Sequence, residues 1–326
     1  MFTPHSLPVA LFMMIASAIC WGSWANTYKG VKNYRFELFY WDYAIGIFLM
    51  SLLLGFTMGN TAPGAPESLL DNIHAADANN ILSTTLGGAI FNLANLLLVA
   101  AIDMAGLAIA FPVAIGIALV VGTVLSFIIQ PRGNAALLAT GVLCALIAVI
   151  LDGKAYGSLA TAGRAASRKS LIVCIVSGVL MGLWNPFVAY GATRGNALTP
   201  YSSVVFLTLG AFLSCFIWNL YFMKRPLVGE PVSFAAFFSG PSSGHLLGLL
   251  GGCIWGVGTV FNVVAGKATA FAISYAIGQS APMVAALWGI FAWKEFAGAP
   301  AKTRFYLGLM FLFYCLGILL VARANG

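Results

Sequence analysis

Several side-chain amides and hydroxyls stand inside long apolar stretches of this sequence. An amide offers a hydrogen-bond donor and an acceptor together, which suits it to recognise a ligand and not to break a covalent bond. An unpaired amide costs several kcal/mol in hydrocarbon, so each must face another helix or a wet cavity. We expect a ligand-binding cavity lined by members of this set, which comprises Asn92, Asn95, Asn185, Thr259, Asn262 and Gln279.

Aromatic residues accompany these polar groups. Phe91 and Trp255 occupy corresponding positions of two similar segments, and Tyr275 follows in the next apolar stretch. Flat rings stack on flat ligands, so rings beside amides suit a planar, amide-rich molecule, although a sugar can stack on Trp255 as well. We expect Trp255 and Phe91 to flank a planar ligand. The edge of that ligand is expected to bond to Asn95, Asn262 and Gln279, with Gln279 as the leading candidate.

Helical spacing supports two shared faces among these candidates. Asn92 and Asn95 are three residues apart, which places them on one side of a helix. Trp255, Thr259 and Asn262 follow at intervals of four and three, so they also share a face. For any one of these residues, contact between helices remains the alternative interpretation.

Acidic residues are rare in the apolar stretches, which favours a neutral substrate. Asp42 lies about one turn inside an expected span, with Glu37 nearer its end. Intramembrane acids are usually functional, so both are candidates for proton coupling. The alternative for Asp42 is a salt bridge to a basic residue of the preceding loop, namely Lys29, Lys32 or Arg35.

No zinc-enzyme motif, paired acids or metal site is indicated. The sequence lacks HExxH and a facing pair of acids, and its six cysteines show no CxxC spacing. We therefore expect neither catalytic activity nor a cofactor or metal ion. A channel is also disfavoured because no ring-forming filter motif is visible.

Composition assigns the chain to the membrane. Of its 326 residues, 61% are hydrophobic and 8% are charged, and the mean hydropathy is +0.95. Such a chain is solvated mainly by lipid, and a helix needs about 20 apolar residues to cross the bilayer. The sequence predicts ten spans, over 8–27, 37–58, 80–102, 106–129, 135–151, 170–190, 200–222, 245–265, 270–292 and 304–322.

The two halves of the chain resemble each other. Two pairs of segments align at near-constant offsets of 164 and 160 residues, namely 87–127 with 251–291 and 15–26 with 175–186. Five spans in each half place the second half upside down relative to the first, as in many transporters. We therefore expect an all-α membrane protein of ten transmembrane helices in two inverted five-helix repeats. The expected division is 1–152, a cytoplasmic linker over 153–169, and 170–326.

Three more candidates stand near the ends of expected spans. The second alignment places Trp24 on Trp184, and Asn185 follows directly. These residues are positioned like two gates, one at each side of the membrane, and we include them in the candidate substrate site. The alternative is that the tryptophans belong to the aromatic belts at the membrane surface.

Basic residues indicate the orientation of the chain. Twelve of the sixteen Lys and Arg residues fall in the odd-numbered connections, and four fall elsewhere. Cytoplasmic loops are enriched in Lys and Arg, so the odd-numbered loops are expected in the cytoplasm and both termini outside. The formal charge of +7 thus marks cytoplasmic loops and not a nucleic-acid surface. We expect a multi-pass protein of the cell inner membrane.

Short motifs across most of the chain resemble the ureide permease family of the drug/metabolite transporter superfamily. They are Gly22–Trp24, Tyr40–Tyr43, Phe56–Gly59, Gly87–Gly88, Asn95, Gly122–Thr123, Gly229–Phe238, Gly248–Cys253, Gln279, Pro282 and Trp288–Phe291. Plant members carry a long central loop with a nucleotide-binding-like motif, whereas 153–169 is short here and has no GxxxxGK[ST] pattern.

The resemblance implies a secondary transporter. Its activity would be proton-coupled uptake (symport) of a neutral planar ureide or nucleobase, of the allantoin, uracil or xanthine type. The neighbouring families leave open a sugar porter of the rhamnose, glucose or ribose type, or another exporter of the superfamily. The sequence does not decide between a monomer and a homodimer.

Overall fold

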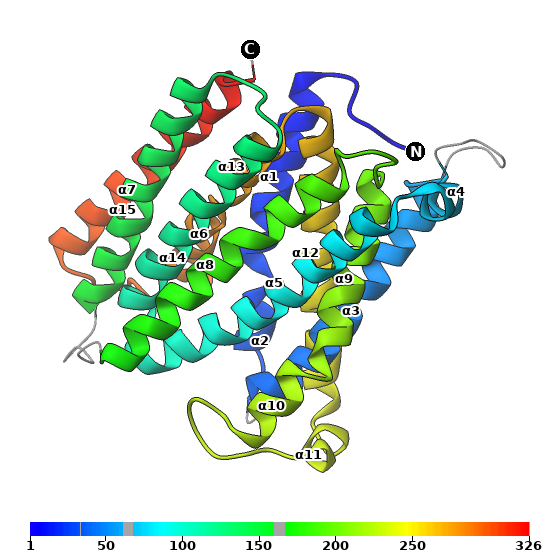
Figure 1. Ribbon diagram of the computed structural model, residues 1–326. Helices are drawn as coiled ribbons and strands as arrows, with labels where there is room; N and C mark the ends of the chain where they lie inside the picture. The colour runs from blue at the N-terminus through cyan, green and yellow to red at the C-terminus, as the bar shows by residue number, and fades with distance from the viewer. Residues whose placement is uncertain (33, 61–67, 160–166, 326) are drawn as a thin grey trace.

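The structure is a computed structural model that describes residues 1–32, 34–60, 68–159 and 167–325. Every regular element in these ranges is a helix (Figure 1). The helices are α1 (Leu7–Ser23), α2 (Ala25–Lys29), α3 (Phe36–Thr57), α4 (Leu69–Ala75), α5 (Ala78–Ala105), α6 (Leu107–Ile129), α7 (Ala135–Leu159), α8 (Arg168–Gly191), α9 (Pro200–Cys215), α10 (Trp218–Lys224), α11 (Phe234–Phe238), α12 (Ser242–Ala268), α13 (Phe271–Gly278), α14 (Ala281–Phe291) and α15 (Ala301–Arg323).

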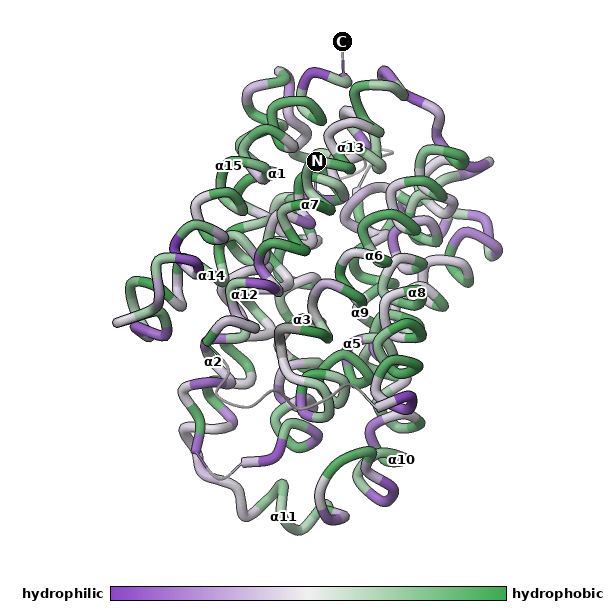
Figure 2. The backbone as a smooth tube through the Cα atoms, turned by 90° about the vertical axis from the view of Figure 1, so that its left-hand side faces the viewer, coloured by the Kyte–Doolittle hydropathy of each residue, from purple (hydrophilic) through white to green (hydrophobic). Residues whose placement is uncertain are grey.

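The long helices form one bundle with two distinct ends. Both termini lie at one end, called here the terminal end, and α10 and α11 lie at the other, called the α11 end (Figure 1). Within the described residues, nine stretches are long and apolar enough to cross a membrane. Hydrophobic colour dominates the helix bodies, and hydrophilic segments gather towards both ends (Figure 2). The predicted all-helical, multi-pass class is therefore confirmed.

The stretch expected as the span 270–292 is broken and is not among those nine. It forms two short helices, α13 and α14, separated at Gln279 and Ser280. Pro282 lies in the first turn of α14. It has no N–H group to donate a helical hydrogen bond, and its ring would clash with the preceding turn of a continuous helix. Gly278 in addition has a low helix propensity. By contrast, α6 stays one helix through Pro112.

Two segments that were expected as loops are partly helical. The linker was predicted to begin at 153, but α7 continues to Leu159, and α8 begins at Arg168. Residues 160–166 lie outside the described residues. The expected loop between 60 and 79 contains α4, whose N-cap Ser68 side chain accepts a hydrogen bond from the Asp71 backbone.

Glycines allow the central helices to pack closely. Gly88 on α5 lies against α9, where a Cβ would collide with the Leu207 carbonyl. Gly252 on α12 lies against α3, where a Cβ would collide with the Tyr43 carbonyl. In both pairs the second helix of one half crosses the third helix of the other, so the halves interlock.

A second pair of glycines fixes the neighbouring crossings. A Cβ on Gly87 would come 2.9 Å from the Cβ of Phe187 and 3.2 Å from the Trp184 carbonyl, which brings α5 against α8. A Cβ on Gly251 would collide with the Thr27 side chain and would lie 3.5 Å from the Trp24 carbonyl, so α12 packs closely against the α1–α2 junction. These crossings bring α1, α5, α8 and α12 together at the centre.

Candidate functional site

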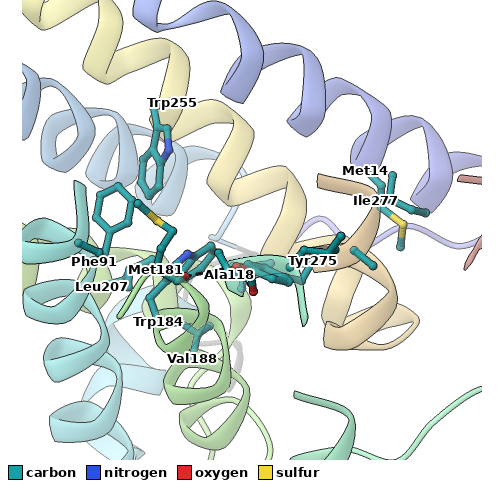
Figure 3. Packing of buried hydrophobic residues seen from close by; sticks show 14 of the residues in the cluster. Met14, Phe91, Ala118, Met181, Trp184, Val188, Leu207, Trp255, Tyr275 and Ile277 are labelled. Atoms are coloured by element: carbon teal, nitrogen blue, oxygen red, sulfur yellow. Dashed lines mark hydrogen bonds between the residues drawn. The ribbon is translucent and has the colours of Figure 1, made fainter. Parts of the chain in front are cut away.

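Aromatic rings from five helices meet at the centre of the bundle, and Figure 3 labels Phe91, Trp184, Trp255 and Tyr275 among them. We call them the aromatic cluster, and they are Trp21 of α1, Phe91 of α5, Trp184 of α8, Trp255 of α12 and Tyr275 of α13. Trp184 lies at their middle, with its ring centroid 5.8 Å from Trp21, 6.3 Å from Phe91 and 5.7 Å from Tyr275. Both halves of the chain therefore contribute rings to one cluster.

The two rings expected to flank a ligand touch each other. Phe91 and Trp255 stack with ring centroids 4.5 Å apart and an interplanar angle of 28°. Trp21 stacks on Trp255 as well, at 6.2 Å and 19°. Because the Phe91–Trp255 stack leaves no room between its rings, a planar ligand must part them or lie beside them.

Tyr275 is anchored by its hydroxyl. The Tyr275 hydroxyl donates to the backbone carbonyls of Ala118, at 3.2 Å, and Met181, at 3.3 Å. A Cβ on Gly122 would collide with its ring, so the glycine makes space for it on α6. Tyr275 thus joins α13 to α6 and α8 and is fully buried.

Three of the expected amides bond to neighbouring helices. The Asn92 amide donates to the Ala211 carbonyl at 3.1 Å and to the Ser214 hydroxyl at 2.8 Å, both on α9. The Asn262 amide donates to the Ser274 carbonyl at 2.9 Å, and the Asn185 amide donates to the Ser126 hydroxyl at 2.7 Å. These donors bond to neighbouring helices, which is the alternative interpretation stated above for any one of these residues.

The shared faces expected from spacing are only partly present. Asn92 faces α9, whereas no hydrogen-bond partner is found for the Asn95 amide nitrogen in the described part of the chain. On α12, Thr259 accepts a hydrogen bond from the Trp21 indole at 3.1 Å, and Asn262 faces α13. Trp255 and Thr259 therefore border the aromatic cluster together.

Gln279 lies at the break between α13 and α14. Its side chain is 8% exposed and has no hydrogen bond to another described residue. A Cβ on the adjacent Gly278 would come 2.5 Å from the Trp21 ring and 2.8 Å from the Asn262 amide. The break therefore adjoins the aromatic cluster, with an amide still available for a ligand.

The gate-like placement of Trp184 is not observed. The α8 helix continues to Gly191, so Trp184 is 2% exposed at the centre of the bundle. Trp24 lies at the junction of α1 and α2, where its ring centroid is 4.7 Å from that of Tyr43. Only Trp24 therefore lies towards one end, and its ring packs inward.

Asp42 pairs with a histidine and not with the basic loop residues. Its Oδ2 lies 2.8 Å from His245 Nδ1, which joins α3 to α12. The Tyr34 hydroxyl donates to the same Oδ2 at 3.4 Å. Burial, and then the charge of Asp42, raise the pKa of Tyr34, so this hydroxyl stays protonated as a donor. Asp42 and His245 are 7% and 27% exposed in their side chains.

Glu37 occupies a different setting from Asp42. Its two carboxylate oxygens accept from the Arg35 guanidinium at 2.6 and 3.1 Å. Arg35 also donates to the Glu230 carbonyl at 2.7 Å, which ties the start of α3 to the loop before α11. Glu37 thus takes part in a peripheral ion pair, and Asp42 is the deeper acid.

A set of polar contacts towards the α11 end joins α1–α2 to α14 and to the segment that follows it. The Trp288 indole donates to the Ser23 hydroxyl at 2.9 Å, and the Trp293 indole donates to the Asn26 side-chain oxygen at 2.5 Å. Lys29 forms a salt bridge with Glu295. Lys294 holds a φ of 53°, a left-handed conformation that is uncommon for residues other than glycine.

Sequence reasoning missed three residues inside the bundle. Trp21 belongs to the aromatic cluster, and His245 is the partner of Asp42. Asp152 on α7 is 2% exposed, and its Oδ1 has no hydrogen-bond partner among the described residues. Within the same residues, no three His, Cys, Asp or Glu side chains gather closely enough to hold a metal ion.

Comparison with known proteins identifies the family. The sequence model of the ureide permease family matches residues 39–172 and 170–323. Ureide permease 1 of Arabidopsis thaliana is 21% identical over 88% of this chain and 89% of its own length. The probable ureide permease A3 of Vigna unguiculata is 22% identical over 81% and 89%.

A solved crystal structure adds a likeness of fold. It superimposes with a TM-score of 0.65 over 98% of this chain and 99% of its own, at 15% identity. The family match covers nearly the whole bundle, from α3 to α15. Because the family consists of transporters, the expectation that this protein is no enzyme is confirmed. The chain belongs to the ureide permease family of membrane transporters.

Proposed function

We propose that this protein is a secondary transporter that takes up a neutral planar ureide or nucleobase, of the allantoin, uracil or xanthine type, together with protons. The observation that carries the proposal is the aromatic cluster beside the amides of Gln279 and Asn95, since among the described residues no hydrogen bond is found for the Gln279 side chain or for the Asn95 amide nitrogen. No acidic or basic residue belongs to this cluster, so a neutral ligand avoids an unpaired buried charge. Stacking and amide bonding both suit a flat ring with alternating N–H and C=O groups.

An inverted-repeat architecture is part of the proposal, with α13 and α14 together as the ninth span of ten. Corresponding glycines support it, because Gly88 and Gly252 lie 164 residues apart and so do their contacts Leu207 and Tyr43. Gly46 and Gly210 repeat the relation, with Leu249 and Thr85 as contacts 164 residues apart. When each residue is replaced by the one 164 positions away, the contact between α5 and α9 therefore becomes the contact between α12 and α3. Such symmetry allows a site at the centre to open to either side.

The broken ninth span supports a transport role. Discontinuous helices place free backbone groups and helix ends at the substrate sites of many transporters. Gln279 caps α13 and precedes the N-cap of α14, close to Trp21. Movement of α14 relative to α13 would therefore change the cluster and the α11 end together.

The proton-coupling part of the proposal rests on Asp42 and His245. They face each other at 2.8 Å, partly accessible from the α11 end through His245. A carboxylate and an imidazole in contact can pass a proton between them. Tyr34 is the third titratable group at this pair, and it keeps its proton as a donor to Asp42. We assign Glu37 a secondary place because Arg35 neutralises it.

The proposed setting is the inner membrane with the α11 end in the cytoplasm. The excess of Lys and Arg in the connections at that end supports this orientation. The aromatic cluster and the Asp42–His245 pair both lie within one chain, so a monomer contains the whole proposed site, and a homodimer is compatible with it.

Counterflow into liposomes tests the function. The purified protein is reconstituted and loaded with unlabelled uracil or allantoin, and the uptake of the same labelled compound is followed. We expect saturable counterflow with ureides or nucleobases and none with glucose, ribose or rhamnose. Counterflow with sugars alone would replace the proposed substrate class with the sugar-porter alternative, and non-saturable flux would indicate a channel.

A further inference from the structure

Three buried polar groups converge one helical turn from the aromatic cluster. They are the hydroxyls of Tyr40 and Tyr43 on α3 and the amide nitrogen of Asn95 on α5. Both tyrosines are fully buried, and Asn95 is 4% exposed. Among the described residues, none of the three groups has a hydrogen-bond partner. Each can donate a hydrogen bond, so we call them the donor cluster.

The donor cluster is compact. The ring centroids of Tyr40 and Tyr43 are 5.2 Å apart, and the Asn95 side chain neighbours the Tyr40 hydroxyl. Asn95 follows Phe91 by one helical turn on α5, so the two share a face. The donor cluster therefore lies next to the Phe91 end of the aromatic cluster.

A cavity lies beyond the donor cluster, towards the α11 end. It has a volume of about 260 Å³, and its lining includes Phe36, Leu96 and Val99. Phe36 precedes Tyr40 by one turn, and Val99 follows Asn95 by one turn. The aromatic cluster, the donor cluster and the cavity thus follow one another between the centre and the α11 end.

Two of the donors, the Tyr40 hydroxyl and the Asn95 amide, lie within reach of each other, so the donor cluster gathers polar groups that packing leaves incompletely paired. A buried hydroxyl or amide without a partner is destabilising, and phenylalanine would fill the space of either tyrosine without that penalty. Other unpaired groups, such as the Tyr314 hydroxyl on α15, stand at separate interfaces. A ligand with acceptors aimed at α3 and α5 would use the convergence of Tyr40, Tyr43 and Asn95.

We propose that the Tyr40 and Tyr43 hydroxyls and the Asn95 amide form a binding subsite for the carbonyl oxygens of the transported molecule. This inference rests on the proposed function, because a ureide or a pyrimidine dione presents carbonyl oxygens at its edge. The ring of the ligand contacts Phe91 and Trp255 while its carbonyls bond to the donor cluster. The adjoining cavity then provides its route to the α11 end.

Binding of uracil and allantoin to the purified protein in detergent, measured by calorimetry, tests the subsite. We expect Tyr40→Phe and Tyr43→Phe to bind either probe about 5- to 150-fold more weakly than the wild type. The melting temperature without ligand should stay equal or rise, since each change removes an unpaired hydroxyl. Tyr314→Phe is the matched control, because it deletes a buried unpaired hydroxyl elsewhere and should leave affinity unchanged.

A thio analogue identifies the acceptor. Sulfur accepts hydrogen bonds more weakly than oxygen, so 2,4-dithiouracil should bind the wild type more weakly than uracil. In the double variant Tyr40→Phe/Tyr43→Phe the difference in affinity between the two compounds should become smaller, because only the Asn95 donor remains, and Asn95→Ala alone should also reduce this difference. Unchanged uracil and allantoin affinity in the double variant would overturn the subsite and leave the proposed function standing. Failure of the wild type to bind either probe would overturn both.

Discussion

Phe91 and Trp255 stack on each other with their ring centroids 4.5 Å apart, and they stand at corresponding positions of α5 and α12. The contact joins the two halves of the chain at the centre of the bundle. A planar ligand that replaces one partner of this stack recovers the aromatic contact that its entry removes. The Phe91–Trp255 contact is therefore the closed, ligand-free form of the proposed site.

Removal of either side of this site should weaken substrate binding. We expect Trp255→Ala and Gln279→Ala to reduce affinity for uracil or allantoin by about 1–3 kcal/mol each, the first through lost stacking and the second through an unmet hydrogen bond. Trp218→Ala, at the start of α10 and away from the cluster, is the control. Calorimetry on the three variants measures the effect, and wild-type affinity in both test variants would remove the pocket from consideration.

The Asp42–His245 pair predicts the behaviour of coupling variants. In Asp42→Asn the neutral amide imitates the protonated acid but cannot release a proton. Accumulation driven by a pH gradient should therefore disappear while counterflow stays measurable. His245→Asn should also lower accumulation, because Asp42 loses its 2.8 Å partner. Both activities are measured in the same liposomes.

Asp152→Asn supplies the contrast for that experiment, since Asp152 is another buried acid within a span. We expect it to retain accumulation. If Asp152→Asn loses accumulation and Asp42→Asn keeps it, the coupling acid lies between α7 and α15. Equal loss of accumulation and counterflow in Asp42→Asn would make its pairing structural.

The internal repeat in the sequence predicts some of the aromatic residues of the site and not others. Phe91 and Trp255 could be found because the alignment pairs two aromatic residues. The other alignment, of 15–26 with 175–186, pairs Trp21 with Met181, so it does not single out Trp21, which stacks on Trp255. An alignment of the two halves finds only positions at which both halves carry a similar residue type. A ligand site does not require this similarity, because its residues need only be complementary to the ligand.

Helix boundaries explain the other omissions. His245 is the first residue of the expected span 245–265, whereas α12 begins at Ser242 and turns the imidazole towards Asp42. Asp152 directly follows the expected span 135–151, whereas α7 extends to Leu159. The partners of Asn92, Asn185 and Asn262 depend on helix rotation, which sequence spacing does not determine.

Glycine contacts predict matched losses of stability in the two halves. Gly88→Ala and Gly252→Ala each force a methyl group into a backbone carbonyl of the facing helix, so each should destabilise the protein by about 1–3 kcal/mol. Gly308→Ala is the control, because no atom lies within 4 Å of its Cβ position, and a helical alanine is if anything favourable. Thermal unfolding in detergent compares them. A large loss in only one of the first two would contradict the proposed symmetry.

The polar contacts at the α11 end predict a charge-dependent gate. An exposed ion pair contributes about 0.2–1 kcal/mol, so Lys29→Glu or Glu295→Lys alone should raise the open fraction by up to about fivefold. The double exchange Lys29→Glu/Glu295→Lys should restore closure. A cysteine at Thr27, which is 7% exposed beneath this contact, reports opening through its labelling rate with a membrane-impermeant thiol reagent.

Labelling should be compared with a second site that the gate does not cover. A cysteine at Ser239, an exposed residue after α11, should react at one rate in all variants. If the Thr27 cysteine reacts equally in the single and double exchanges, the Lys29–Glu295 pair does not control this end.

The distribution of basic residues predicts that both termini lie outside the cell. Twelve Lys and Arg residues fall in the odd-numbered connections and four fall elsewhere, and the described parts of these connections lie towards the α11 end, which directs that end to the cytoplasm. A reporter that is active only in the cytoplasm should be silent when fused after residue 325 and active when inserted in the loop between α10 and α11. A reporter active only outside should give the opposite pattern. Cytoplasmic activity at the C-terminus would reverse the orientation, and the Lys29–Glu295 contact and the Asp42–His245 pair would then face the exterior.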